Sequence, residues 1–298
     1  MMHFIDLDTG TDQLLAKKRA GLGILTLNRP NAKNALSSKL TPALRKMIKQ
    51  LGEDDEVGAV LITGAGDAFC AGGDVKGMAT RDDPILTADQ KILKLVEGQR
   101  QLTGALVKFR KPVVAALPGP AVGAGLSLAL ACDIRIGSSS SFVTTGYARV
   151  GLSGDYGISS LLTRAVGSGR ARELLFTSER IDSKRCLELG IYNRLVPDNE
   201  LLDYSINFAD ELARGPRKAL ALMKDNLEDA LVLNFEDSLD REAPRLIEAM
   251  ASSDHKEAVR AFVEKRKPVF GVTSVSYTHL RAHETRGNRV CRLLREKK

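Results

Sequence analysis

Residues 118–133 read PGPAVGAGLSLALACD, and the rest of the chain is organised around this stretch. The run before it, KPVVAAL (Lys111–Leu117), is short and rich in Val and Ala, which predicts a buried strand. The Pro-Gly-Pro of residues 118–120 ends that strand in a turn. From Leu126 nearly every residue is apolar, which is typical of a buried helix. The small residues 123–125 therefore lie where that helix begins, and the free backbone N–H groups there favour negative charge on a ligand oxygen.

The composition is that of an ordinary globular protein, with 298 residues of which 43% are hydrophobic and 27% charged. This length allows one large domain or two smaller ones. No apolar run approaches the ~20 residues of a membrane helix, and the N-terminus lacks the layout of a signal peptide. The four cysteines are widely spaced and form no metal pattern. We therefore expect a cytoplasmic protein without disulfides, membrane partner or metal site.

The net charge of +7 would point to nucleic acid as a partner, but its distribution argues otherwise. Residues 272–298 hold seven basic and two acidic residues, a net +5, which leaves +2 for the rest. This segment has no apolar period, so we expect a non-native or disordered basic tail. RNA binding through such a tail is a remote alternative, and it would weaken with salt.

The predicted elements alternate between strand and helix up to about Gly157, which implies crossover units and a largely parallel sheet. Strands are expected at 13–18, 23–27, 59–64, 111–117, 133–137 and 141–145, and helices from about 38, at 89–108 and from 126. Helical patterns then follow at 158–166, 170–177, 183–189, 200–214, 216–232, 235–250 and 254–264, with only 194–196 extended. We expect an α/β core over residues 1–200 and a helical C-terminal region over 201–271.

Two turns of small residues follow predicted strands, CAGGD (Cys70–Asp74) and VGAGL (Val122–Leu126). If the two strands are neighbours, one backbone N–H from each turn can point at the same carbonyl oxygen. Such a pair would form an oxyanion hole made of main chain. For either turn alone, tight packing of small residues is the simpler explanation. The presence of both turns favours the oxyanion hole.

The turns and their surroundings resemble the crotonase family, also called the enoyl-CoA hydratase/isomerase superfamily, from about Leu14 to Phe270. The matching pieces are LTLNRPNAKNAL, FCAGGDVKGM, KPVVAALPGPAVGAGLSLALACDIRI, LLTRAVG, ARELLFTSERIDSKRCLELGIYNRLV and AFVEKRKPVF. The resemblance implies a crotonase-like spiral of ββα units whose helical C-terminal region mediates trimerisation. It also implies acyl-CoA thioester substrates, with coenzyme A as part of the substrate and no separate cofactor, and a homotrimer or dimer of trimers.

The resemblance assigns site residues by position. The two oxyanion donors fall on the N–H groups of Gly73 and Ala124, where Ala124 replaces the more usual Gly. The loops that contact CoA match Asn31, Ala32, Lys33, Gly72, Asp74 and Val75. The C-terminal helix, which often reaches the CoA of a neighbouring subunit, supplies Phe262 and Lys265. A solvated charge is the alternative interpretation of Lys265.

The acid–base positions depart from the best-known pattern. Hydratases of the family use two glutamates, and this chain has Ser127 and Tyr147 at those positions. The remaining carboxylate is Asp155, at a position that resembles the aspartate of dienoyl-CoA isomerases and of isomerases of ring-opened epoxyphenylacetyl-CoA. The alternative is that Asp155 only caps the helix that begins near Gly157. Tyr147 would line the acyl pocket or donate a hydrogen bond, and the first is the favoured interpretation.

One shuttling base suffices for a 1,3-proton shift, whereas hydration needs water activated and a proton delivered to carbon. The sequence therefore favours an enoyl-CoA isomerase in which Gly73 and Ala124 hold the enolate oxygen and Asp155 moves the proton. The alternatives are an enoyl-CoA hydratase that uses Asp155 with water or Tyr147, and a catalytically silent acyl-CoA-binding homologue.

Overall fold

The computed structural model describes residues 4–74 and 86–271. Within them, one sheet has the strand order β1-β2-β3-β4-β5-β7-β10, in which β1 to β3 are antiparallel and β3 to β10 are parallel. Its strands are β1 (Ile5–Leu7), β2 (Leu14–Arg19), β3 (Leu22–Leu27), β4 (Ala59–Gly64), β5 (Val113–Leu117), β7 (Ile134–Ser138) and β10 (Arg194–Val196). The expected α/β class with a largely parallel sheet is confirmed.

A second, smaller sheet holds β6 (Ala121–Val122), β8 (Phe142–Thr144) and β9 (Ile181–Asp182). The strand expected at 141–145 is confirmed as β8, whereas β6 and β9 were not predicted. The chain passes from β5 to β6 and into helix α5 (Ala124–Leu130). It then passes from β7 to β8 and on to helix α6 (Ile158–Thr177). These two turns of the chain thus each contribute one strand to each sheet before a helix, as expected for a spiral of ββα units.

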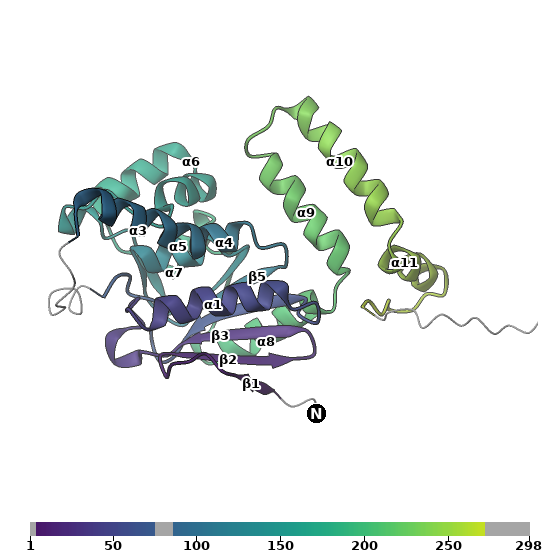
Figure 1. Cartoon of the computed structure of the whole chain (residues 1–298), viewed down its shortest axis with the longest axis horizontal. Helices are drawn as coiled ribbons and strands as arrows, with labels where there is room; N and C mark the ends of the chain where they lie inside the picture. The colour runs from purple at the N-terminus through teal and green to yellow at the C-terminus, as the bar shows by residue number, and fades with distance from the viewer. Residues whose placement is uncertain (1–3, 75–85, 272–298) are drawn as a thin grey trace, which may run out of the picture.

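The middle of the large sheet is covered on both faces. All residues of β4 and β5 are buried, and their sequences AVLITG and VVAAL are continuous apolar runs, as strands covered on both faces require. One face packs in a large core against helix α1 (Leu40–Glu53), α5 and α6. The other packs in a smaller core against helix α8 (Leu201–Ala213). Figure 1 shows α1 and α8 on opposite sides of the strands.

One helical segment differs from the expectation and a second agrees with it. The pattern predicts one helix over 89–108, whereas the structure has α3 (Ala88–Gln101) and α4 (Thr103–Val107), separated at Leu102, whose φ of −110° and ψ of −89° are not helical. Leu102 is fully buried, so the break directs its side chain into the core. The two helices predicted at 158–166 and 170–177 are confirmed: they form the two parts of α6, and Gly167, whose φ of 78° and ψ of 163° are not helical, separates them.

The C-terminal region is helical, as predicted. It contains α8, α9 (Arg217–Asp229), α10 (Phe235–Met250) and α11 (Ser253–Val263). The remaining helices lie earlier in the chain: α7 (Ser183–Glu188) and the short 3-10 helices η1 (Pro30–Ala32), η2 (Ala148–Val150) and η3 (Asp198–Glu200). Figure 1 shows α9, α10 and α11 extending away from the sheets as one arm, which we name the C-terminal arm (residues 217–263). By contrast, α8 packs against the sheet, so by packing it belongs with the α/β core. The predicted tail, 272–298, lies outside the described residues.

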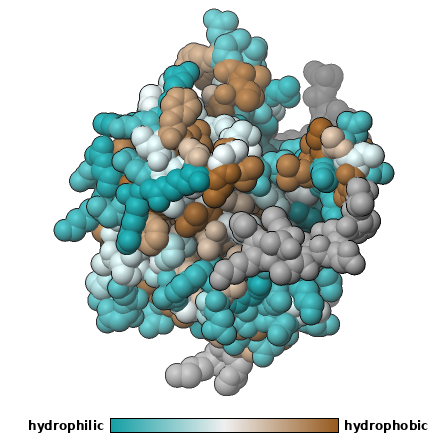
Figure 2. Space-filling model, turned by 90° about the vertical axis from the view of Figure 1, so that its left-hand side faces the viewer, coloured by the Kyte–Doolittle hydropathy of each residue, from teal (hydrophilic) through white to brown (hydrophobic). Residues whose placement is uncertain are grey.

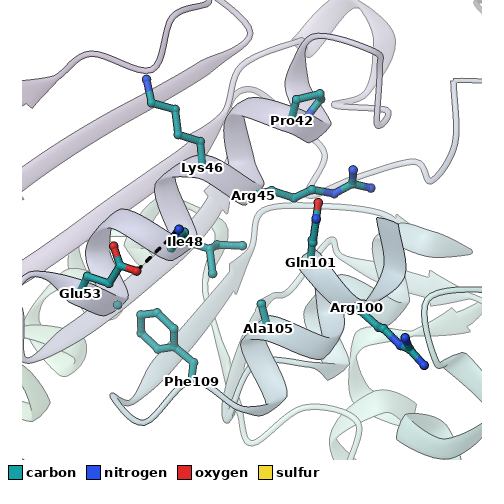
Figure 3. A pocket seen from close by; sticks show the side chains of 11 residues that line it. Pro42, Arg45, Lys46, Ile48, Glu53, Arg100, Gln101, Ala105 and Phe109 are labelled. Carbon is teal, nitrogen blue, oxygen red and sulfur yellow. Dashed lines mark ion pairs between the residues drawn. The ribbon is translucent and has the colours of Figure 1, made fainter. Parts of the chain in front are cut away.

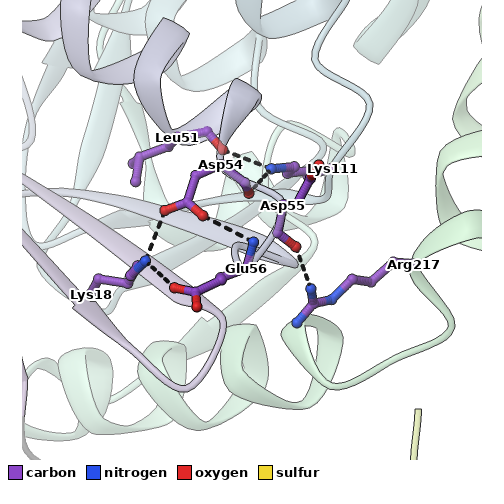
Figure 4. A network of polar contacts seen from close by, with 7 residues as sticks. All are labelled: Lys18, Leu51, Asp54, Asp55, Glu56, Lys111 and Arg217. Carbon is purple, nitrogen blue, oxygen red and sulfur yellow. Dashed lines mark hydrogen bonds and ion pairs between the residues drawn. The ribbon is translucent and has the colours of Figure 1, made fainter. Parts of the chain in front are cut away.

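A polar network joins the base of the C-terminal arm to the end of α1 (Figure 4). Lys111 Nζ donates to the carbonyl oxygen of Leu51, in the last turn of α1, at 2.8 Å and to that of Asp54, the residue after the helix, at 2.6 Å. Arg217, the first residue of α9, donates to the Asp55 carbonyl at 2.7 Å. Burial lowers the pKa of Lys111. The network therefore fixes where the arm leaves the core.

The two small-residue turns approach each other so closely that only glycine fits at the contact. A Cβ added to Gly125 would overlap the carbonyl of Cys70, and one added to Gly119 would overlap the carbonyl of Asp67. The backbone of the 65–74 loop therefore lies directly against the backbone of the central turn.

We expect Gly125→Ala to lower the free energy of unfolding by about 1–3 kcal/mol, because the added methyl must displace backbone rather than a flexible side chain. Denaturant unfolding measures the change. Gly169→Ala is the matched control: it is also helical, an added Cβ there meets nothing within 4 Å, and it should leave stability equal or higher. Equal stability of Gly125→Ala and wild type would contradict the close contact.

Candidate active site

The two predicted turns lie side by side, because their strands β4 and β5 are parallel neighbours in the large sheet. Beyond the strands, an isolated bridge joins Cys70 to Ala121: Cys70 N–H donates to the Pro120 carbonyl at 3.1 Å, and Val122 N–H donates to the Cys70 carbonyl at 2.9 Å. A Cβ on Gly72 would lie 2.8 Å from the Val122 carbonyl oxygen and 3.6 Å from the Ala124 nitrogen. The condition set by the sequence for a two-turn site is therefore met.

The Gly73 N–H points away from Leu36, the residue with which Gly73 forms an isolated parallel bridge. Leu36 N–H donates to the Gly72 carbonyl at 2.7 Å, and Asp74 N–H donates to the Leu36 carbonyl at 3.3 Å. In such a parallel bridge the amide of the middle residue, here Gly73, faces the opposite side. Gly73 is exposed, and no described residue accepts a hydrogen bond from its N–H.

The Ala124 N–H is oriented by the residue before it. Gly123 has φ 53° and ψ −121°, a conformation open to glycine, and its own N–H donates to the Thr144 carbonyl at 3.1 Å. Ala124 is then the first residue of α5, and its N–H also finds no acceptor among the described residues. Two free backbone donors therefore lie on adjacent turns.

The three family acid–base positions meet in one cluster. The Tyr147 hydroxyl donates to Asp155 Oδ1 at 2.7 Å, and the Ser127 hydroxyl donates to the Asp155 carbonyl oxygen at 3.2 Å. The Tyr147 ring also lies against the turn that precedes α5, since a Cβ on Gly123 would be 3.8 Å from its Cζ atom. The Asp155 carboxylate is thus connected to the turn that carries Ala124 through one aromatic side chain.

The environment of this cluster shifts both of its ionisable groups. Burial raises the pKa of Asp155, and the hydrogen bond from Tyr147 only partly opposes that rise. Burial, followed by the charge of Asp155, raises the pKa of Tyr147 well above its usual range. Tyr147 therefore stays a neutral hydrogen-bond donor, while Asp155 is a carboxylate that accepts a proton more readily than an exposed one.

Two sequence interpretations are resolved by this geometry. The residue before α6 is Gly157, and no side chain caps the helix there, so Asp155 is not a helix cap. Tyr147 is buried as a pocket-lining residue would be, but it also makes the hydrogen bond that the sequence analysis placed second.

The predicted CoA-contacting loops lie against each other. The Ala71 N–H donates to the Lys33 carbonyl at 2.9 Å, and Lys33 Nζ pairs with Asp67 at 2.6 Å. Asn31 and Lys33 are exposed, and Ala32 is half-buried between them. Asp74 pairs with Arg29 at 2.9 Å, in agreement with a role in ordering its loop. Val75 lies outside the described residues.

Sequence reasoning missed Asn34, which holds these loops together. Asn34 is fully buried, and its side-chain amide donates to the carbonyls of Ala65 at 2.9 Å and Ala68 at 2.7 Å, while its oxygen accepts from the Arg29 N–H at 2.8 Å. A second Asn in NAKNA was the available signal, because asparagine is the side chain that can satisfy several backbone groups of a loop at once.

Phe262 and Lys265 are not brought to the turns of their own chain. Phe262 is 84% exposed on α11, and Figure 1 shows α11 in the C-terminal arm, on the opposite side of the molecule from α3 and α5. Any contact of these residues with a bound CoA would therefore involve another copy of the chain.

A cavity elsewhere in the described part of the chain is separate from these residues. It has a volume of 710 Å³ and lies between α1 and the α3–α4 segment, with Ile48, Ala105 and Phe109 facing inward and Arg45 at one side (Figure 3). It does not include Gly73, Ala124 or Asp155. Among the described residues no group of His, Cys, Asp and Glu could hold a metal ion. No described helix is long and apolar enough to cross a membrane.

Comparisons with known proteins agree with this geometry. The profile of the family described as enoyl-CoA hydratase/isomerase matches residues 17–273. The chain is 30% identical to the short-chain-enoyl-CoA hydratase of Clostridium acetobutylicum, over 86% of this chain and 96% of that protein. It is 33% identical to the 1,2-epoxyphenylacetyl-CoA isomerase of Escherichia coli, over 86% and 97%. A crystal structure of an enoyl-CoA hydratase from Polaromonas sp. JS666 superposes with a TM-score of 0.79 at 31% identity, over 86% and 98%.

The chain therefore belongs to the enoyl-CoA hydratase/isomerase family, the crotonase superfamily. The resemblance read from its turns is confirmed.

We expect Tyr147→Phe to raise the pKa of Asp155 further, because the variant loses the hydroxyl that stabilises the ionised carboxylate. Titration of the Asp155 side-chain carboxyl by ¹³C NMR measures the change and needs no substrate. Tyr204→Phe is the control, since the Tyr204 hydroxyl contacts Arg194 instead. An unchanged Asp155 pKa in Tyr147→Phe would mean that the hydrogen bond does not form in solution.

Proposed function

We propose that this chain shifts a double bond in an enoyl-CoA thioester, with Asp155 as the single base. The observation that carries the proposal is the acid–base cluster. Ser127 and Tyr147, at the positions where the resemblance places two glutamates, both donate hydrogen bonds to Asp155. Asp155 therefore supplies the one carboxylate of the cluster. A 1,3-proton shift needs one group that takes a proton from one carbon and returns it to another.

The thioester oxygen would bind to the N–H groups of Gly73 and Ala124. Removing a proton next to the thioester places negative charge on that oxygen, and these two donors face no other acceptor among the described residues. One such donor typically contributes about 2.7–4 kcal/mol of transition-state stabilisation. The exposed side chains of Asn31 and Lys33, on the loop that lies against residues 71–74, support a CoA site beside the oxyanion hole.

The raised pKa of Asp155 supports its role as the shuttle. A base works best when its pKa lies near the working pH, and burial moves Asp155 in that direction from its ordinary ~3.9. Tyr147 keeps the carboxylate oriented without competing for the proton, because its own pKa is far higher.

Hydration of a 2-enoyl-CoA is the second candidate, because relatives such as the C. acetobutylicum enzyme are named hydratases. Asp155 would then activate water, with Tyr147 as the hydrogen-bond partner. A panel of 2-enoyl- and 3-enoyl-CoA thioesters separates the two functions: a hydratase product is heavier by one water, whereas an isomerase product has the mass of its substrate. No turnover of any member would favour a silent acyl-CoA-binding protein.

The exposed apolar side chains support assembly into a homotrimer or dimer of trimers. The C-terminal arm leaves large apolar residues in solvent, among them Leu227, Leu231, Leu239, Leu246, Ile247 and Phe262. Figure 2 shows further apolar patches on the end of the molecule that lies at the left of Figure 1. Surfaces of this kind mark contacts with another protein surface, and a second copy of the chain is the partner that is always present.

We expect Asp155→Asn to lower isomerisation by about 100- to 10,000-fold, because the amide cannot take up a proton. Solvent-deuterium exchange into the substrate should be lost in parallel. Asp203→Asn, at an exposed position of α8, is the control. Full turnover by Asp155→Asn would remove Asp155 from the reaction.

The stability of the same variant has a predictable sign. Since folding raises the pKa of Asp155, this group favours the folded state below its unfolded pKa and loses that contribution as the pH rises through its folded pKa. Asp155→Asn should therefore be as stable as wild type or more stable at neutral pH.

We expect the double variant Leu246→Glu, Ile247→Glu to lose the oligomer, since it places charge on a helix face of the arm that is more than 60% exposed in the single chain. Sedimentation velocity measures the assembly state. Leu202→Glu, at an exposed leucine of α8, is the control. A wild-type chain that sediments as a monomer would overturn the assembly proposal without touching the proposed reaction.

A further inference from the structure

Asp155 lies in a turn with an uncommon backbone conformation. Within residues 154–157, Gly154 has φ +114°, Tyr156 has φ +51° and Gly157 has φ +79°. A left-handed conformation is ordinary for glycine but costs free energy for a large residue such as tyrosine. A residue in such a conformation persists only where surrounding contacts hold it, so contacts from the surrounding structure must hold this turn.

The peptide unit between Asp155 and Tyr156 is held at both of its polar ends. Its carbonyl oxygen accepts from the Ser127 hydroxyl of α5 at 3.2 Å and from the Ile158 N–H at 3.2 Å. Its N–H donates to the side-chain oxygen of Gln99, from α3, at 2.6 Å. Two helices far apart in the sequence therefore fix the plane of the peptide that follows the Asp155 side chain.

The Tyr156 side chain is anchored as well. Its hydroxyl interacts with Arg45 of α1, whose charge opposes the rise that burial gives the pKa of Tyr156. Arg45 passes closely over Gly98 of α3, where a Cβ would lie 2.7 Å from the guanidinium. The absence of a side chain at Gly98 thus lets α1 support the same turn that Gln99 holds from α3.

We propose that Gln99 is a positioning residue for Asp155: by accepting the Tyr156 N–H, it fixes the direction in which the Asp155 carboxylate points. This inference rests on the proposed function, in which Asp155 must reach two carbons of one substrate. Gln99 orients Asp155 through the backbone, by accepting the N–H of the next residue, whereas Tyr147 donates a hydrogen bond to the carboxylate itself.

The experiment uses the full chain and compares three variants of α3. Gln99→Met has a similar shape without the acceptor, Gln99→Glu keeps an acceptor oxygen, and Gln101→Met is the matched control. Gln101 is exposed, and its amide contacts only Glu97 among the described residues. Turnover is measured with trans-3-hexenoyl-CoA, and the pKa of Asp155 by ¹³C NMR of its carboxyl.

We expect Gln99→Met to lower kcat by about 10- to 100-fold with KM unchanged, because a small misplacement of a catalytic group slows the chemical step. The pKa of Asp155 should fall toward its ordinary value, since a loosened turn exposes the carboxylate to water. The titratable groups around it are the hydroxyls of Tyr147 and Tyr156, and neither is altered by the variant. Gln99→Glu should recover much of kcat, and Gln101→Met should match wild type.

Unchanged kcat and unchanged Asp155 pKa in Gln99→Met would overturn the inference, as would a lower kcat with an unchanged Asp155 pKa. A wild type that turns over no enoyl-CoA would defeat the proposed function instead. The Asp155 titration of Gln99→Met would then still decide whether Gln99 positions the carboxylate.

Discussion

The contact between two backbone turns is the constraint on which the rest of this structure depends. The 65–74 loop and the 118–125 turn approach without side chains between them, and Gly119 and Gly125 are the positions where any Cβ would overlap a carbonyl. This closeness brings the Gly73 and Ala124 amides to one place. It also requires β4 and β5 to be neighbours, because loops that leave distant strands could not meet in this way.

The second half of the candidate site is built from the side chains of Ser127, Tyr147 and Asp155. Ser127 and Tyr147 are neutral, so they add no second carboxylate and instead hold the backbone and the side chain of Asp155. A single half-buried carboxylate with a neutral donor is suited to carrying a proton between two carbons. Because burial raises the pKa of Asp155, the ionised carboxylate lowers the stability of the folded state at neutral pH. Groups that serve an activity often reduce stability in this way.

A well-formed cavity lies apart from the candidate site. It has a volume of 710 Å³, lies between α1 and the α3–α4 segment, and contains none of Gly73, Ala124 and Asp155. The candidate site is open to solvent at Gly73 in the single chain. The C-terminal arm does not cover it, because the arm lies on the opposite side of the molecule from α3 and α5. An oligomer would change which surfaces enclose it, and the apolar residues left exposed on the arm are consistent with such an enclosure.

The sequence by itself determined the α/β class, the positions of most strands of the large sheet, and the two turns, because buried strands such as VVAAL and small-residue turns leave local patterns. It also singled out Asp155 as the remaining carboxylate. It predicted one helix over 89–108, since periodicity cannot show that burial of Leu102 breaks the helix there. Strands β6 and β9 of the second sheet were missed because strands as short as Ala121–Val122 leave no periodic signal. Only the tertiary structure joined Tyr147 to the Asp155 carboxylate and brought Gln99 to the Tyr156 amide, because such contacts depend on where separate elements meet.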